Sequence, residues 1–219
     1  MQLKCESYVY LLLLAFVIES KVTIAPGTLT KAEFTSTVTA NGYSPPNEEI
    51  YRYFIEDTRN FSRGDAAMLI AQLIHESGGF KFTEQIDCSK GDHCKGWYVD
   101  EVGLLNKSYH GRGYIQLTWG ANYRAASEGL GLGDKLLRAP ELVASDKRLA
   151  MRVSVWYWNA RVKPLLDARK NQFGVTTRGI NPGECVKGNL LARRRYLIYL
   201  KVAETLKIAE KVEESGCYD

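Results

Sequence analysis

The chain has 219 residues and a formal net charge of +4, a length that suits one domain with a hydrophobic core or at most two small ones. Its densest basic cluster, Arg193-Arg194-Arg195, would point in three directions on a helix, so the charge pattern argues against a nucleic-acid-binding surface. No internal repeat, low-complexity tract or long Pro/Gly linker divides the chain, which indicates a single domain.

The first 20 residues have the pattern of a secretory signal peptide. Lys4 gives a positive start, residues 9–18 are apolar, and Ser20 is a small residue at the expected cut. The apolar run is too short to span a membrane, which takes about 20 apolar residues. We therefore expect a signal peptide at 1–20, no membrane span, and a secreted, extracellular domain at 21–219.

The cysteine content supports secretion. Loss of the signal peptide would remove Cys5 and leave an even set, as an oxidised extracellular domain requires. Cys88 and Cys94 with His93 could be metal ligands, but no fourth partner is evident, so we expect no metal. Sequons at Asn60 and Asn106 indicate glycosylation. The four remaining cysteines allow three pairings, among Cys88, Cys94, Cys185 and Cys217.

Helical patterns dominate and strand patterns are scarce along the chain. Ser62-Arg-Gly-Asp65 has the form of a capping box that opens a helix, and Gly78 and Gly79 would end that helix after Glu76. Residues 82–118 are rich in loop signals, and the glycine string 129–133 follows a helix rather than a strand, against a dinucleotide cofactor. The expected helices are 29–40, 48–56, 62–76, 122–129, 145–158 and about 190–213, which together predict a mainly α fold.

The position of Glu76 suggests acid catalysis. It falls in the last turn of an apolar helix, where the negative end of the helix dipole and poor hydration both disfavour a charged carboxylate. A carboxylic acid kept protonated near neutral pH is what a general acid requires. The structural alternative is that Glu76 caps the helix or pairs with a nearby arginine.

The sequence lacks the residues that a zinc protease or a serine nucleophile would require. His75-Glu76 could open an H-E-x-x-H zinc motif, but Gly79 stands at the fourth position on, and no G-x-S-x-G elbow exists. Carboxylate chemistry needs a second acid, and Glu84 is the nearest beyond the glycine turn. The remaining candidates for that second acid are Asp87, Asp100 and Glu101.

Four segments carry a family resemblance. "AQLIHESGGF", "YHGRGYIQLTWGANYRAAS", "PELVASDKRLAMRVSVWYW" and "GINPGEC" occur in this order and resemble the successive landmarks of glycoside hydrolase family 19, the plant-type chitinases and their bacterial and phage relatives. The resemblance covers nearly all of residues 28–218. It implies a lysozyme-like α-helical domain with a long catalytic cleft, a loop-rich insert, and disulfides Cys88–Cys94 and Cys185–Cys217.

The resemblance also implies an inverting mechanism on β-1,4-linked N-acetylglucosamine. By position, Glu76 matches the acid, Glu84 the base and Thr118 the hydroxyl that holds the water. Trp156 could add an apolar face for sugar rings, although its helical spacing with Trp158 favours the core. The other matched residues are His75, Gln116, Asn122 and Asn181 for sugar binding, Tyr109 and Trp119 as aromatic faces, and Glu184 with Arg195 as a charged pair that tunes the carboxylates.

Three departures accompany the match. The spacing from Glu76 to Glu84 is one residue shorter than in compact relatives, Tyr114 stands where proline is common, and Asn181-Pro-Gly183 replaces Asn-Gly-Gly. The sequence thus predicts a secreted, monomeric endo-chitinase without metal or organic cofactor, acting on chitin or N-acetylglucosamine oligosaccharides. The alternatives are a peptidoglycan hydrolase, and a non-catalytic chitin-oligosaccharide binder that has lost the base.

Overall fold

The computed structural model describes residues 29–90, 94, 96–169 and 171–218. The expected signal peptide, Cys5 and His93 lie outside the described residues. The helices are α1 (Lys31–Ala40), α2 (Glu48–Thr58), α3 (Arg63–Ser77), α4 (Gly120–Gly129), α5 (Lys135–Arg138), α6 (Leu142–Ser145), α7 (Lys147–Tyr157), α8 (Lys163–Ala168), α9 (Gly174–Ile180) and α10 (Leu190–Thr205), with a π-helical stretch η2 (Trp158–Val162) and a 3-10 turn η3 (Pro182–Glu184).

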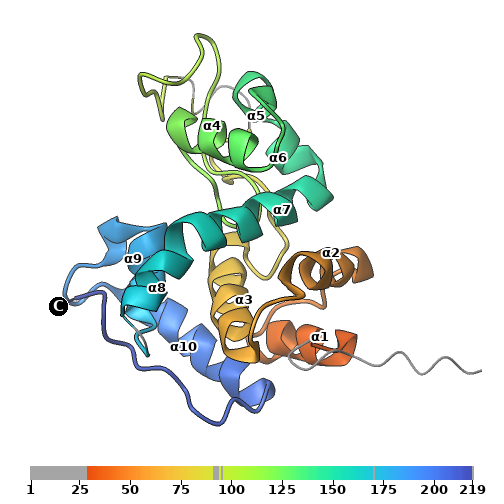
Figure 1. The fold of residues 1–219 in the computed structure, drawn as a ribbon, viewed down its shortest axis with the longest axis vertical. Helices are drawn as coiled ribbons and strands as arrows, with labels where there is room; N and C mark the ends of the chain where they lie inside the picture. The colour runs from red at the N-terminus through yellow and green to blue at the C-terminus, as the bar shows by residue number, and fades with distance from the viewer. Residues whose placement is uncertain (1–28, 91–93, 95, 170, 219) are drawn as a thin grey trace, which may run out of the picture.

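The described chain is helical, as expected, with isolated β-bridges in place of strands. α3 stands at the centre of a helical lobe formed by α1–α3 and α8–α10, and α10 packs along it (Figure 1). The described part of residues 78–146 forms a second lobe that carries α4, α5 and α6, and α7 runs between the two lobes. None of the helices in the described residues combines the length and the apolar character needed to cross a bilayer.

The amino-acid sequence explains why α3 is central. Its residues from Ala66 to Ile74 are all buried, so this helix is apolar on every side and can only be stable inside the domain. The hydroxyl of Ser62 accepts a hydrogen bond from the Asp65 amide at 3.0 Å, as a helix N-cap should. The carboxylate of Asp65 binds Lys163 of α8 at 3.1 Å, so that side of the expected capping box is used in tertiary packing. A complete capping box occurs instead at Thr30 and Glu33 of α1.

Several predicted boundaries change in the structure. The helix expected to reach residue 213 ends at Thr205, because the chain turns at Lys207 and runs back as an extended segment. Glu213 then pairs with Gln172 in a parallel bridge, and its carbonyl accepts from Phe173 at 2.7 Å. Helix α9, which follows Phe173, was not predicted.

Both disulfides expected from the resemblance are present. Cys88–Cys94 closes a short loop in the second lobe, and Cys185–Cys217 fastens the C-terminal segment beside η3. The prediction of a mainly α domain with two disulfides is confirmed.

Candidate active site

Glu76 lies in the last turn of α3, next to the point where the helix stops. Gly78 adopts the left-handed conformation (φ 60°, ψ 50°) that ends the helix, a backbone geometry that glycine adopts without strain. The side chain of Glu76 is only 14% exposed, and it lines a cleft of about 400 Å³ between the two lobes.

Arg195 of α10 connects two carboxylates beneath this cleft. The guanidinium is buried (1% exposed). Its Nη1 lies 2.6 Å from Glu76 Oε1 and also donates to Gln72 Oε1 at 2.8 Å. Its Nε and Nη2 donate to the two oxygens of Glu184 at 2.7 and 2.8 Å. Asn181 adds a hydrogen bond to Glu184 at 3.0 Å, so Glu184 is held by a bidentate fork and an amide, whereas Glu76 has one contact with Arg195.

The two carboxylates therefore titrate differently. Burial raises the pKa of Glu76, and the charge of Glu184 adds to the effect, while Arg195 opposes it. Burial alone would also raise the pKa of Glu184, but the hydrogen bonds and charge of Arg195 outweigh it and hold that pKa below its usual value. Carboxyl pairs whose pKa values are pushed apart supply acid and base functions in enzymes. In this pair, Glu76 is the group whose pKa is raised, as a general acid requires.

His75 stays neutral beside this cluster. Burial, then the charge of Arg195, lowers the pKa of His75 to about 3. Its Nδ1 is buried without a hydrogen-bond partner in the described structure. His75 does not line the cleft, so its assignment to sugar binding gains no support from its position and stays a prediction.

The wall opposite Glu76 comes from the segment that enters α4. Gln116, Thr118, Trp119 and Asn122 all line the cleft. The Thr118 hydroxyl donates to the Gln116 carbonyl at 2.8 Å, and the Asn122 amide donates to the Thr118 carbonyl at 2.9 Å. Gln116 and Trp119 have positive φ angles of 55° and 78°, a strained conformation for non-glycine residues that is concentrated at functional sites.

Asn181 completes the cleft from the helical lobe. It follows α9 and lines the cleft with Pro182 and Gly183. The departures at 181–183 therefore shape the cleft floor. Of the nine residues assigned catalytic or sugar-binding roles, six meet in this cleft: Glu76, Gln116, Thr118, Trp119, Asn122 and Asn181.

Glu84 does not line the same cavity as Glu76. It lies in the second lobe, where it forms a β-bridge with Arg112. Arg112 forms another β-bridge with Leu117 of the cleft wall. Adjacent strands are about 4.8 Å apart, which places the Glu84 backbone ~10 Å from that of Leu117. Its Oε1 is 2.8 Å from His110 Nε2 and 3.3 Å from Arg112 Nε. The structure thus gives Glu84 its own charged surroundings, separate from the Arg195 cluster.

The structure corrects the assignment of Tyr109 as an aromatic face and agrees with the preference of Trp156 for the core. Tyr109 is 1% exposed, donates to the Leu137 carbonyl at 2.7 Å, and packs edge-on against Tyr123, so it offers no ring face to a sugar. Trp156 lies over Gly129, where there is no room for a Cβ atom, and does not line the cleft. Trp158 is fully buried, which confirms its assignment to the core.

Trp119, in contrast, is 46% exposed and lines the cleft. Tyr98 meets it edge-on at 5.5 Å. Tyr98 and Tyr157 also line the cleft and were missed by sequence reasoning. Tyr98 lies outside the four family segments, and Tyr157 stands between two tryptophans whose spacing favours the core.

The other carboxylates considered as second acids have different surroundings. Asp100 accepts from the Gly103 and Ala121 amides at 2.8 and 2.9 Å, which ties its loop to the start of α4. Asp87 and Glu101 are exposed and line no part of the cleft. Among the described residues, no group of three or more His, Cys, Asp or Glu side chains is placed to hold a metal ion.

Comparison with known proteins decides the family. The family model described as chitinase class I, of glycoside hydrolase family 19, matches residues 28–168. The chain belongs to glycoside hydrolase family 19. This confirms the resemblance carried by the four sequence segments.

Plant endochitinases match much of the chain. The chain is 37% identical over 171 residues to endochitinase At2g43610 of Arabidopsis thaliana. This alignment covers 73% of this chain and 57% of that protein. It is 39% identical over 148 residues to endochitinase At2g43620 of the same plant, covering 67% and 50%. The chain thus spans about half the length of these curated relatives.

Solved family 19 structures share the fold. Chitinase C from Streptomyces griseus HUT6037 superposes with a TM-score of 0.69 at 22% identity, covering 88% of this chain and 99% of that chain. A class IV chitinase from Zea mays superposes with a TM-score of 0.58 at 24% identity, covering 87% of both chains. The lysozyme-like helical architecture expected from the sequence is confirmed.

Proposed function

We propose that this protein is a secreted endo-chitinase that hydrolyses β-1,4-linked N-acetylglucosamine with inversion at the anomeric carbon. One observation carries the proposal: Arg195 holds Glu184 by two hydrogen bonds, while Glu76, whose pKa is raised by burial, faces the cleft.

The proposed chemistry uses Glu76 and Thr118, which line the cleft, and Glu84, which lies outside that cavity. Glu76 gives its proton to the glycosidic oxygen as the bond to the anomeric carbon breaks. A water on the other face of the sugar attacks that carbon, and Glu84 takes the water's proton. Inverting enzymes place their carboxyl groups about 6.5–9.5 Å apart to leave room for this water. The Thr118 hydroxyl, which lines the cleft with Glu76 and follows Leu117 of the bridged segments, is the group we assign to hold it.

The cleft suits a neutral sugar with acetamido groups. Gln116, Asn122 and Asn181 supply amides that both donate and accept hydrogen bonds, and Trp119 supplies an exposed indole for the apolar face of a ring. The relatives in Arabidopsis thaliana are named endochitinases, which agrees with chitin as the substrate class.

Secretion rests on two features. The first 20 residues have the pattern of a signal peptide, and all four cysteines of the expected mature domain pair as disulfides, a state that persists in oxidising compartments.

The test is incubation with soluble chitin oligomers, with products separated by chain length and anomer immediately after cleavage. Internal cleavage with α-anomers formed first supports the proposal, and β-anomers formed first contradict inversion. Clearing of a bacterial wall suspension with chitin oligomers left intact would identify a peptidoglycan hydrolase instead. Tight oligomer binding without turnover across a wide pH range would identify a sugar binder without a working base.

A further inference from the structure

We propose that His110 is a positioning residue for Glu84, holding one oxygen of the carboxylate through its Nε2–H so that the other oxygen is left for the attacking water. The inference rests on the proposed function, since it concerns the group assigned there as the base.

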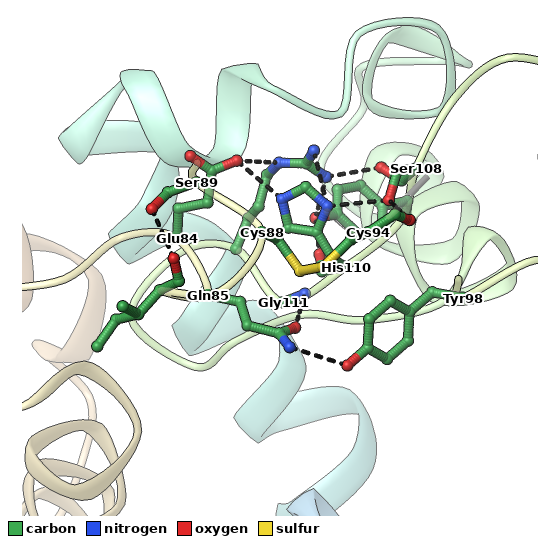
Figure 2. Close-up of a disulfide and its surroundings, with 12 residues drawn as sticks. Glu84, Gln85, Cys88, Ser89, Cys94, Tyr98, Ser108, His110 and Gly111 are labelled. Carbon is green, nitrogen blue, oxygen red and sulfur yellow. Dashed lines mark hydrogen bonds and ion pairs between the residues drawn. A yellow bond between two sulfur atoms is a disulfide. The ribbon is translucent and has the colours of Figure 1, made fainter. Parts of the chain in front are cut away.

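The geometry around Glu84 is asymmetric. Nε2 of His110 lies 2.8 Å from Glu84 Oε1, and Nε of Arg112 lies 3.3 Å from the same oxygen. Figure 2 shows the His110 ring at this one end of the carboxylate, and Arg112 meets the same oxygen. In the part of the chain that the structure describes, Oε2 of Glu84 has no hydrogen-bond partner. One oxygen is therefore anchored and the other is available.

The neighbours of His110 determine which ring nitrogen carries the proton. Nδ1 lies 3.3 Å from Nη2 of Arg112, and a guanidinium can only donate. Nδ1 also lies 2.9 Å from the Ser108 hydroxyl, which can donate. A neutral ring that accepts at Nδ1 must carry its proton on Nε2, and this proton then points at Glu84.

Burial and hydrogen bonds hold the His110 ring in a fixed position within the second lobe. His110 is 4% exposed and Arg112 is 6% exposed. The Tyr123 hydroxyl donates to the His110 carbonyl at 2.8 Å, and Arg112 Nη1 donates to the Tyr123 hydroxyl and the Ser108 carbonyl at 3.1 and 2.8 Å. Ser108 in turn lies against Cys94 of the disulfide loop, 3.4 Å from its carbonyl (Figure 2).

Burial is the main effect that favours the neutral form of His110. Burial lowers its pKa and the charge of Arg112 adds to this, although the bond to Glu84 opposes both. A neutral donor fixes the carboxylate without cancelling the negative charge that a base needs. Holding a base within a narrow range of positions reduces the cost of reaching the transition state.

A matched pair of variants separates this role from simple packing. In His110→Gln the side-chain amide nitrogen takes the place of Nε2 and still donates to Glu84, whereas in His110→Asn the amide takes the place of Nδ1 and the donor to Glu84 is lost. We expect His110→Asn to lower kcat about 10- to 100-fold, the range of a hydrogen bond to a charged group. KM should change little, and the acidic limb of the pH–rate profile should move to higher pH. His110→Gln should recover most of kcat.

Equal kcat values for the two variants, at equal melting temperatures, would overturn the proposal. Glu84→Gln distinguishes this failure from a failure of the proposed function. If Glu84→Gln abolishes turnover while His110→Asn is as active as the wild type, only the positioning role is wrong; if Glu84→Gln is active, Glu84 is not the base and both fall.

A measurement on the unaltered protein tests the proposal even if the variants do not fold. The ¹⁵N shifts of the three histidines report which ring nitrogen carries the proton. At neutral pH we expect His110 with a protonated Nε2 and a bare Nδ1. The opposite tautomer would contradict the hydrogen bond on which the proposal depends.

Discussion

Arg195 Nη1 lies 2.6 Å from Glu76 Oε1, so the buried guanidinium reaches the carboxyl group that lines the cleft. Its Nε and Nη2 are directed at Glu184. One buried positive charge thus acts on two carboxylates unequally: the pKa of Glu184 is lowered and that of Glu76 is raised. The helix end at Gly78 places Glu76 at the cleft.

Removing the charge of Glu184 should change the pH range of activity. The charge of Glu184 raises the pKa of Glu76, and in Glu184→Gln Arg195 would also be free to pair fully with Glu76. Both effects lower the pKa of Glu76, so the general acid loses its proton sooner and the alkaline limb of the kcat/KM profile moves to lower pH. Glu204→Gln, an exposed change on the same helix, is the control and should leave the limb in place. An alkaline limb that stays or moves upward in Glu184→Gln would contradict the coupling.

His75 should make folding less favourable in acid. Its pKa is about 3 in the folded state, against 6.5 without the fold. Between these values the unfolded chain binds a proton that the folded chain does not, so the free energy of unfolding falls as pH decreases from about 6.5 to about 3. His75→Gln, which does not titrate, should show a shallower fall in urea unfolding across that window. Equal slopes for the two proteins would show that His75 does not carry this dependence.

The two disulfides should stabilise the domain to different extents. Cys185–Cys217 closes a separation of 32 residues and Cys88–Cys94 one of 6. Loop-entropy arguments assign the larger effect to the longer loop, within a usual range of about 2–4 kcal/mol. Urea unfolding of C185S/C217S and C88S/C94S under non-oxidising conditions checks the order. A larger loss in C88S/C94S would contradict it.

Trp119 should contribute to sugar binding. It is 46% exposed, lines the cleft and is supported by Tyr98, so its indole is available to the apolar face of a ring. We expect Trp119→Ala to raise KM for chitin oligomers about tenfold, with a smaller change in kcat. A tenfold change corresponds to the upper end of the about 0.5–1.5 kcal/mol that an aromatic contact contributes. Trp97→Ala is the matched control, because Trp97 is 58% exposed and does not line the cleft. The same rise in KM for both variants would show that the effect is not specific to the cleft.

Local patterns in the sequence predict most of the fold but only part of the site. The N-cap at Ser62 and the left-handed Gly78 locate α3 and place Glu76 at its end, because both are set by residues a few positions away. The end of α10 at Thr205 depends instead on Glu213 pairing with Gln172, a contact between distant segments. Contacts between distant segments also limit what the sequence predicts about the site. The family resemblance suggests Glu84 as the base, but only the folded chain shows that His110 and Arg112 contact it. Burial also removes Tyr109 as a sugar contact, which residue type alone could not show.

The most direct test of the mechanism is turnover of chitin oligomers by Glu76→Gln. Glutamine keeps the size and hydrogen-bonding capacity of the side chain but cannot deliver a proton. The account predicts a folded variant that binds oligomers as the wild type does, while kcat falls by about 10²–10⁴-fold, the usual contribution of acid–base catalysis. The alkaline limb should disappear from any residual rate. Near-normal turnover would mean that Glu76 only pairs with Arg195 at the end of α3, and would contradict its role as the acid.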